Sequence, residues 1–164
     1  MRGIFGIVLL LVALVIWAGF AEAQGGGFIA RLSAQETVPQ ANSVATGLAV
    51  FQTSADGTRF FYRLEVTNIE NMLMAHIHIG PPGQSGPIVA WLYPYRPPAR
   101  LIPGVFSGIV ATGTITEENL VGPLQGKSLS ALLAEIQGGN AYVNVHTSRF
   151  PAGEIRGQIR RSSR

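Results

Sequence analysis

Short stretches in which apolar and polar side chains alternate recur along most of the chain, and they constrain its fold more than any other feature. In the clearest stretch, residues 58–67, the apolar residues Phe60, Tyr62, Leu64 and Val66 occupy every second position. A period of two predicts a strand with one buried face and one solvated face. Glycine, proline and asparagine separate the stretches, as turns between strands require. The chain is therefore predicted to be all-β, an antiparallel Greek-key sandwich or barrel of about eight strands.

The same patterns set approximate bounds for each element. Strands are expected at 28–33, 44–53, 58–67, 74–80, 88–93, 105–115, 141–147 and 154–160. One short helix is expected at 128–137, where four apolar residues form a single stripe and Gly138 follows as a stop signal. Ala55, Asp56 and Gly57 are typical of a hairpin turn. Residues 94–103 hold four prolines and predict a long irregular loop, which is a plausible contact surface.

The first 23 residues have the pattern of a secretory signal peptide. Arg2 precedes an apolar run at 4–20, and the small residues Ala21 and Ala23 stand at the positions that a signal peptidase reads. Retention of this segment as a membrane anchor is the alternative. The predicted division of the chain is a signal peptide at 1–23, a flexible leader at 24–27, one domain at 28–160 and a basic tail at 161–164.

Cysteine is absent from the sequence, which excludes disulfides, zinc–thiolate sites and a thiol nucleophile. Together with the predicted signal peptide, this composition favours a secreted or periplasmic protein that needs no disulfides. The formal net charge is +3, but the arginines are scattered singly except at the C-terminus. A nucleic-acid partner is therefore not expected.

All three histidines of the chain fall in two predicted strands. His76 and His78 alternate in the stretch MAHIHIG and therefore share one face, and His146 lies in YVNVHT with Tyr142 and Asn144 on its own face. Three imidazoles suit zinc or copper, with a fourth position open to water or a carboxylate. The metal-ligand candidates are thus His76, His78 and His146. The alternative is that these histidines are structural and hydrogen-bond to backbone carbonyls or to a neighbouring side chain.

Three further residues are candidates for supporting positions around such a site. In the last strand, Glu154 and Arg156 share a face, so Glu154 could orient an imidazole and Arg156 could attract an anion. Asn144 lies on the strand face of His146. A Glu154–Arg156 network that fixes strand register is the competing interpretation. No arrangement of nucleophile and base is evident, and the adjacent acids Glu117 and Glu118 are expected to point apart.

Three segments resemble the CHRD domain, the module first described in chordin. They are AHIHIGPPGQSGPIV at 75–89, GGNAYVNVHTSRFPAGEIRGQI at 138–159 and RLSAQETVPQANSVATGLAVF at 31–51. The resemblance implies an immunoglobulin-like β-barrel or sandwich. In chordin the module belongs to an extracellular antagonist of bone morphogenetic proteins. This chain has one copy of the module and lacks cysteine-rich repeats, so that activity is not carried over.

A looser likeness links the chain to the copper-zinc superoxide dismutase type of sandwich, which also carries a His-x-His pair on a strand. The likeness covers His76, His78 and His146 alone. The dismutase holds two metal ions with more histidines than this chain contains, so a bimetallic site is excluded.

These observations lead to three hypotheses for function. The first is a secreted or cell-envelope binding module without catalytic activity, whose partner is an unidentified protein or surface polymer. The second is a copper- or zinc-binding envelope protein with a three-histidine site. The third is an oxidoreductase that depends on this metal. No membrane span is expected in the mature chain.

Overall fold

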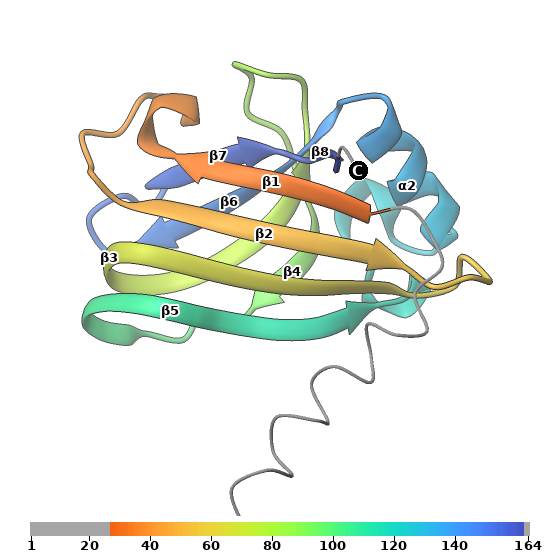
Figure 1. The fold of residues 1–164 in the computed structure, drawn as a ribbon, viewed down its shortest axis with the longest axis horizontal. Helices are drawn as coiled ribbons and strands as arrows, with labels where there is room; N and C mark the ends of the chain where they lie inside the picture. The colour runs from red at the N-terminus through yellow and green to blue at the C-terminus, as the bar shows by residue number, and fades with distance from the viewer. Residues whose placement is uncertain (1–26, 163–164) are drawn as a thin grey trace, which may run out of the picture.

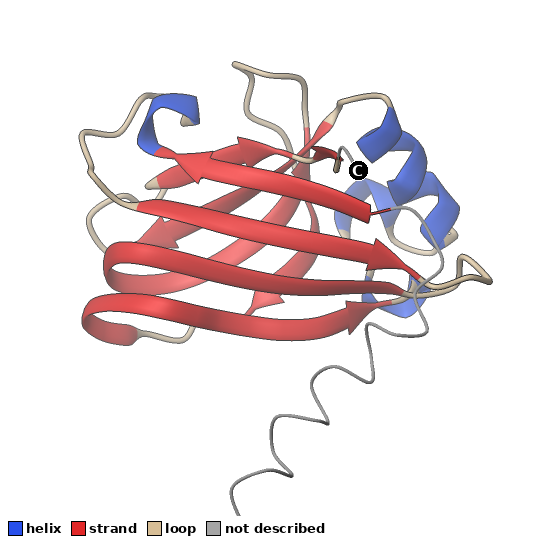
Figure 2. Ribbon diagram, viewed as in Figure 1, coloured by secondary structure: helices blue, strands red, loops and turns tan. Residues whose placement is uncertain are grey.

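The computed structural model describes residues 27–162, and within this range the chain forms eight strands and one α-helix. The strands are β1 (Gly27–Ser33), β2 (Thr46–Thr53), β3 (Phe60–Ile79), β4 (Ile88–Tyr93), β5 (Ile102–Ile115), β6 (Ala141–Thr147), β7 (Ile155–Gln158) and β8 (Arg160–Arg161). The helix is α2 (Leu129–Gln137), and short 3₁₀ turns occupy Ala34–Glu36, Glu117–Asn119 and Gly122–Leu124. The predicted all-β class is confirmed (Figure 2). The predicted signal peptide lies outside the described residues.

Five strands close into an antiparallel barrel in the described part of the chain. β1 pairs with β2, β2 with β3, β3 with β6 and β6 with β7, and the pair Ser33 and Arg156 joins β7 back to β1. On the free side of β3, β5 pairs with its first part and β4 with its second part. Figure 1 shows this layered arrangement, with β1, β2, β3 and β5 in front and β6 and β7 behind.

Strand β3 is longer than expected and corrects the predicted break at 68–71. The sequence suggested two strands, 58–67 and 74–80, but one strand runs from Phe60 to Ile79. Asn68 and Asn71 take left-handed φ angles of 57° and 49°, which asparagine tolerates better than most residues. Bulges at these positions bend the strand without ending it. The bend carries the second half of β3 away from β2 and brings it between β6 and β4.

The barrel interior is filled by the alternating apolar residues of the strands. Phe60, Tyr62, Leu64 and Val66 of β3 are all buried, as their spacing predicts. The hairpin between β2 and β3 forms at the predicted turn, where the Asp56 carboxylate accepts hydrogen bonds from Ser54 and Thr58. Because this interior is apolar, the polar residues of β6 and β7 must lie on the outer face of the barrel.

Helix α2 covers one end of the barrel (Figure 1). It begins at Leu129 with Ser128 as its N-cap, one residue later than predicted. Leu129, Leu132 and Ile136 are buried on its apolar stripe. The largest other differences from the predicted bounds are that β5 begins at Ile102, three residues earlier than expected, and that the last predicted strand is divided into β7 and β8. Among residues 27–162, no helix has the length and apolar character needed to cross a membrane.

Candidate metal centre

Pairing of β3 with β6 brings the three histidines together. The register places His76 opposite Asn144, His78 opposite Tyr142 and Met74 opposite His146. Alternation puts all these side chains on the outer face of the barrel, because Ala75 and Ile77 fill the core. One nitrogen of each imidazole lies within 4.8 Å of one nitrogen of the other two. Two segments that are some seventy residues apart in the chain therefore form one cluster.

The cluster is buried although it lies outside the barrel core. His76 has an exposed fraction of 0%, His78 of 7% and His146 of 5%. The Nδ1 atom of His76 lies 3.2 Å from the Nε2 atom of His146. In a tetrahedral site with metal–nitrogen bonds of about 2.0–2.1 Å, ligand nitrogens are about 3.3 Å apart. Two of the three imidazoles thus already have the spacing of a metal site.

Main-chain carbonyls fix the orientation of two rings. The Nδ1 atom of His78 donates a hydrogen bond to the carbonyl of Gly86 at 2.9 Å, and the Nδ1 atom of His146 donates one to the carbonyl of Pro151 at 2.9 Å. A neutral imidazole that donates from Nδ1 carries its lone pair on Nε2. This is the usual support for a histidine that binds metal, whose second nitrogen donates to a carbonyl or carboxylate.

Three buried side-chain atoms in the described residues lack a hydrogen-bond partner, and two of them belong to this cluster. They are the Nε2 atoms of His76 and His78 and the Oδ1 atom of Asn144. An unsatisfied buried polar atom costs about 1–3 kcal/mol, so a ligand that pairs with such atoms would stabilise the protein. Here they lie on one face of two paired strands.

The environment keeps the three imidazoles neutral. Burial lowers the pKa of His76 from 6.5 to about 3, with a further contribution from the neighbouring His146 and His78. Burial also lowers the pKa of His78 to about 4, although its hydrogen bond to Gly86 acts in the opposite direction. The pKa of His146 is lowered for the same reason. Neutral imidazole is the form that binds a metal ion.

Aromatic rings pack against two of the histidines in the cluster. The Trp91 ring on β4 meets the His76 ring edge to face with centroids 4.2 Å apart. The Tyr142 ring stacks on His78 at 5.0 Å, and the Arg156 guanidinium lies 3.5 Å above the Tyr142 ring. This packing restricts the rotation of His76 and His78.

The glycine- and proline-rich loop 80–87 covers this face of the barrel. Arg156 donates to the carbonyls of Gln84 and Pro81, and the backbone N–H of Gly86 donates to the Tyr142 hydroxyl. A Cβ atom on Gly86 would lie 1.7 Å from the carbonyl oxygen of Ile79, so only glycine fits at this position. The loop is thus held in place by the same residues that surround the histidines.

The predicted supporting residues lie in different environments. Asn144 donates from Nδ2 to the carbonyl of Ala152 and is the neighbour of His76 across the strand pair. Arg156 binds the loop and stacks on Tyr142, as described above. The Glu154 carboxylate accepts hydrogen bonds from Ser43 and Thr147. Both carboxylate oxygens of Glu154 are therefore occupied by hydroxyl groups.

Sequence reasoning missed several residues at this site. The carbonyls of Gly86 and Pro151 orient two of the histidines, and the Trp91 ring packs on the third. Every residue has a main-chain carbonyl, so the sequence does not show which of them accept hydrogen bonds from the histidines. Trp91 could have been found, because it falls in the strand that follows the loop.

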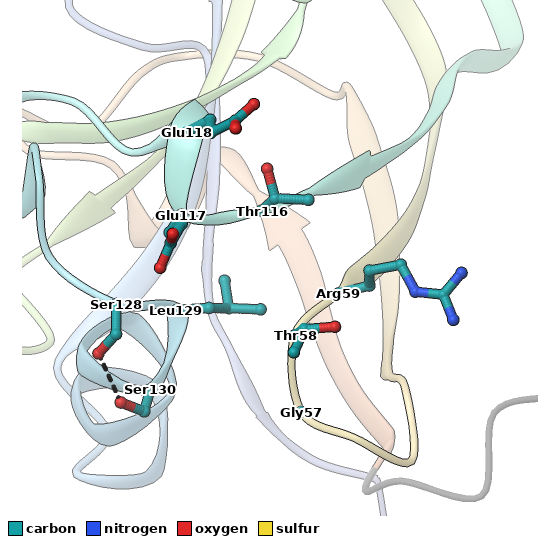
Figure 3. A pocket seen from close by; sticks show the side chains of 9 residues that line it. All are labelled: Gly57, Thr58, Arg59, Thr116, Glu117, Glu118, Ser128, Leu129 and Ser130. Atoms are coloured by element: carbon teal, nitrogen blue, oxygen red, sulfur yellow. Dashed lines mark hydrogen bonds between the residues drawn. The ribbon is translucent and has the colours of Figure 1, made fainter.

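A separate open cleft lies at the helical end of the barrel, between the β2–β3 hairpin and α2 (Figure 3). Glu117 and Glu118 point apart there, and the hydroxyl groups of Ser128 and Ser130 hydrogen-bond to each other. This cleft contains no histidine.

Fold and site together define a closed antiparallel β-barrel with a buried three-histidine cluster on its outer face. The family model of the CHRD domain matches residues 28–159, and the chain therefore belongs to the CHRD-domain family. No curated protein and no solved structure matches the chain. The resemblance noted in the sequence is thus confirmed over nearly the whole described range.

Proposed function

We propose that this CHRD-type module binds one copper or zinc ion through His76, His78 and His146. The observation that carries the proposal is the convergence of three buried, neutral imidazoles, two of which are oriented by main-chain carbonyls. Imidazole nitrogen is a preferred ligand of both metals. When bound through the Nδ1 atom of His76 and the Nε2 atom of His146, the ion would also take up the lone pair of the His78 Nε2 atom, which now has no partner.

A purely structural role for the histidines explains less of the arrangement. The contact between His76 and His146 can be a hydrogen bond in the metal-free protein, which satisfies one nitrogen of each ring. It leaves the Nε2 atoms of His76 and His78 buried without a partner. If these side chains served only to fill space, apolar side chains of similar volume would make the protein more stable.

Export to the cell envelope or the extracellular space is part of the proposal. It rests on the signal-peptide pattern of residues 1–23 and on the absence of cysteine from the sequence. Mass spectrometry of the protein recovered from its native host tests it. Cleavage after Ala23 gives a chain that begins at Gln24, whereas a retained leader contradicts the proposal.

A second candidate function is docking of a protein or surface polymer without catalysis. The loop between β4 and β5 favours it, because Tyr95 and Leu101 expose 53% and 52% of their surface. Exposed aromatic and aliphatic side chains on a loop are typical of contact surfaces. Metal binding and docking use different residues and are compatible with each other.

Calorimetric titration of the metal-free protein with Zn²⁺ and Cu²⁺, followed by elemental analysis, tests metal binding. One ion per chain is expected for the wild type, and its loss is expected for the double variant His76→Ala with His78→Ala. A matched control is Arg63→Ala with Glu65→Ala, which removes an exposed ion pair from the same strand. Absence of binding at micromolar concentration, or binding that both double variants retain, refutes the proposal.

A further inference from the structure

Met74 occupies the next position on the histidine face of β3. Alternation along the strand puts Met74, His76 and His78 on one side, and the register places Met74 directly opposite His146. Side chains that face each other across an antiparallel pair have Cβ atoms about 4.5–5.5 Å apart. The thioether of Met74 therefore lies within reach of the imidazole that completes the cluster.

Packing in the core does not account for this methionine. Met72 stands two residues earlier, but a bulge between Met72 and Met74 reverses the alternation, so Met72 is fully buried in the hydrophobic core. Among the described residues, Met74 belongs neither to that core nor to the partly buried side chains that pack against it. It is half-buried at the edge of a cluster whose three histidines are buried.

The charged groups around the histidine cluster favour a monovalent over a divalent metal ion. The metal-ligand cluster contains three histidines and no carboxylate. The nearby Glu154 is occupied by Ser43 and Thr147, and the cation Arg156 lies over the same Tyr142 ring on which His78 stacks. Because the cost of burying an ion rises with the square of its charge, neutral ligands beside a guanidinium favour a monovalent ion over a divalent one.

We propose that Met74 supplies a thioether as the fourth ligand and that the site prefers Cu(I) to Zn(II); this inference rests on the metal site proposed above. Thioether sulfur is a soft ligand that selects Cu(I), whereas zinc sites are built from cysteine, histidine and carboxylate. Three imidazoles and one thioether give four neutral ligands to an ion of charge +1. The partly exposed position of Met74 places the soft ligand on the solvent side, where an incoming ion arrives.

Anaerobic competition titration of the full chain tests this inference, with Cu(I) measured against a chromophoric Cu(I) chelator and Zn(II) against a zinc indicator. The variant Met74→Leu keeps the side-chain volume and removes the sulfur. The matched control is Met72→Leu, the same substitution on the core side of the strand. X-ray absorption at the copper edge gives a second readout, because sulfur scatters differently from nitrogen.

The expected result is that Met74→Leu weakens Cu(I) binding by about tenfold or more, at least the loss seen when a group that only supports a ligand is removed. Zn(II) affinity is expected to change by less than about twofold, and a sulfur contribution at the copper edge disappears. If Met74→Leu weakens the binding of both metals equally, or leaves Cu(I) affinity unchanged, the inference is overturned, but the proposed three-histidine site is not. If wild-type protein binds neither metal, the proposed function itself fails.

Discussion

The Nδ1 atom of His76 lies 3.2 Å from the Nε2 atom of His146, although 70 positions separate the two residues in the chain. The contact depends on the pairing of β3 with β6, which is a step in closing the barrel. A metal ion bound to both nitrogens would therefore link strand β3 to the hairpin formed by β6 and β7. This link makes the stability of the barrel sensitive to the occupant of the site.

Metal addition is expected to raise the melting temperature of the protein. An ion that binds only the folded state at 100 times its dissociation constant stabilises it by about 2.7 kcal/mol. For a domain of this size, that corresponds to a rise of about 5–10 °C. Differential scanning calorimetry with and without zinc measures the shift. The variant His78→Ala should show no shift, and an equal rise in that variant would mean that the metal binds elsewhere.

Acidification is expected to destabilise the metal-free protein. Unfolded histidines take up protons near pH 6.5, whereas burial lowers the pKa of His76 to about 3 and that of His78 to about 4. The unfolded chain therefore binds more protons below pH 6.5, and the free energy of unfolding falls as the pH drops from 6.5 towards 3. Urea denaturation at pH 7.5, 6.0 and 5.0 measures this dependence.

The matched variant for the pH experiment is His76→Gln with His78→Gln, which removes two of the three histidines whose pKa values are lowered. Its stability should change less than that of the wild type between pH 7.5 and 5.0. If the two proteins show the same dependence on pH, the buried histidines are not its source.

Gly86→Ala is expected to disturb the site through the backbone. The new Cβ would lie 1.7 Å from the carbonyl oxygen of Ile79, so the loop must move and the hydrogen bond from His78 is lost. Such overpacking costs about 1–3 kcal/mol. Gly83→Ala in the same loop is the control, since its Cβ would meet nothing within 4 Å and only its positive φ opposes the change. Urea denaturation and metal titration of both variants should show the larger loss for Gly86→Ala, and equal losses would contradict the account.

Arg156→Lys is expected to loosen loop 80–87. The guanidinium donates to two main-chain carbonyls, at 2.8 Å to Gln84 and 3.0 Å to Pro81, and an ammonium group cannot reproduce this fork. Loss of one hydrogen bond from a charged donor costs about 1.5–3 kcal/mol. The exposed Arg160→Lys is the control and should be nearly neutral. Hydrogen exchange of the loop amides measures the effect, which should be confined to Arg156→Lys.

The alternation of apolar and polar residues determines how much of this fold could be predicted from the sequence. A period of two indicates strands and their faces, so the class and the shared face of His76 and His78 could be predicted. Strand order is a long-range property, and the proximity of His146 depended on the β3–β6 pair, which no local pattern specifies. The continuity of β3 was missed because Asn68 and Asn71 look like a turn, whereas the structure uses them as bulges. The orienting carbonyls of Gly86 and Pro151 could not be predicted, since every residue has one.

The most direct measurement is a crystal structure of the protein grown with copper or zinc, with anomalous scattering recorded at the metal edge. We expect one anomalous peak per chain, at bonding distance from a nitrogen of each of His76, His78 and His146. A cluster without a peak, in crystals where the ion binds only to exposed carboxylates, would contradict it.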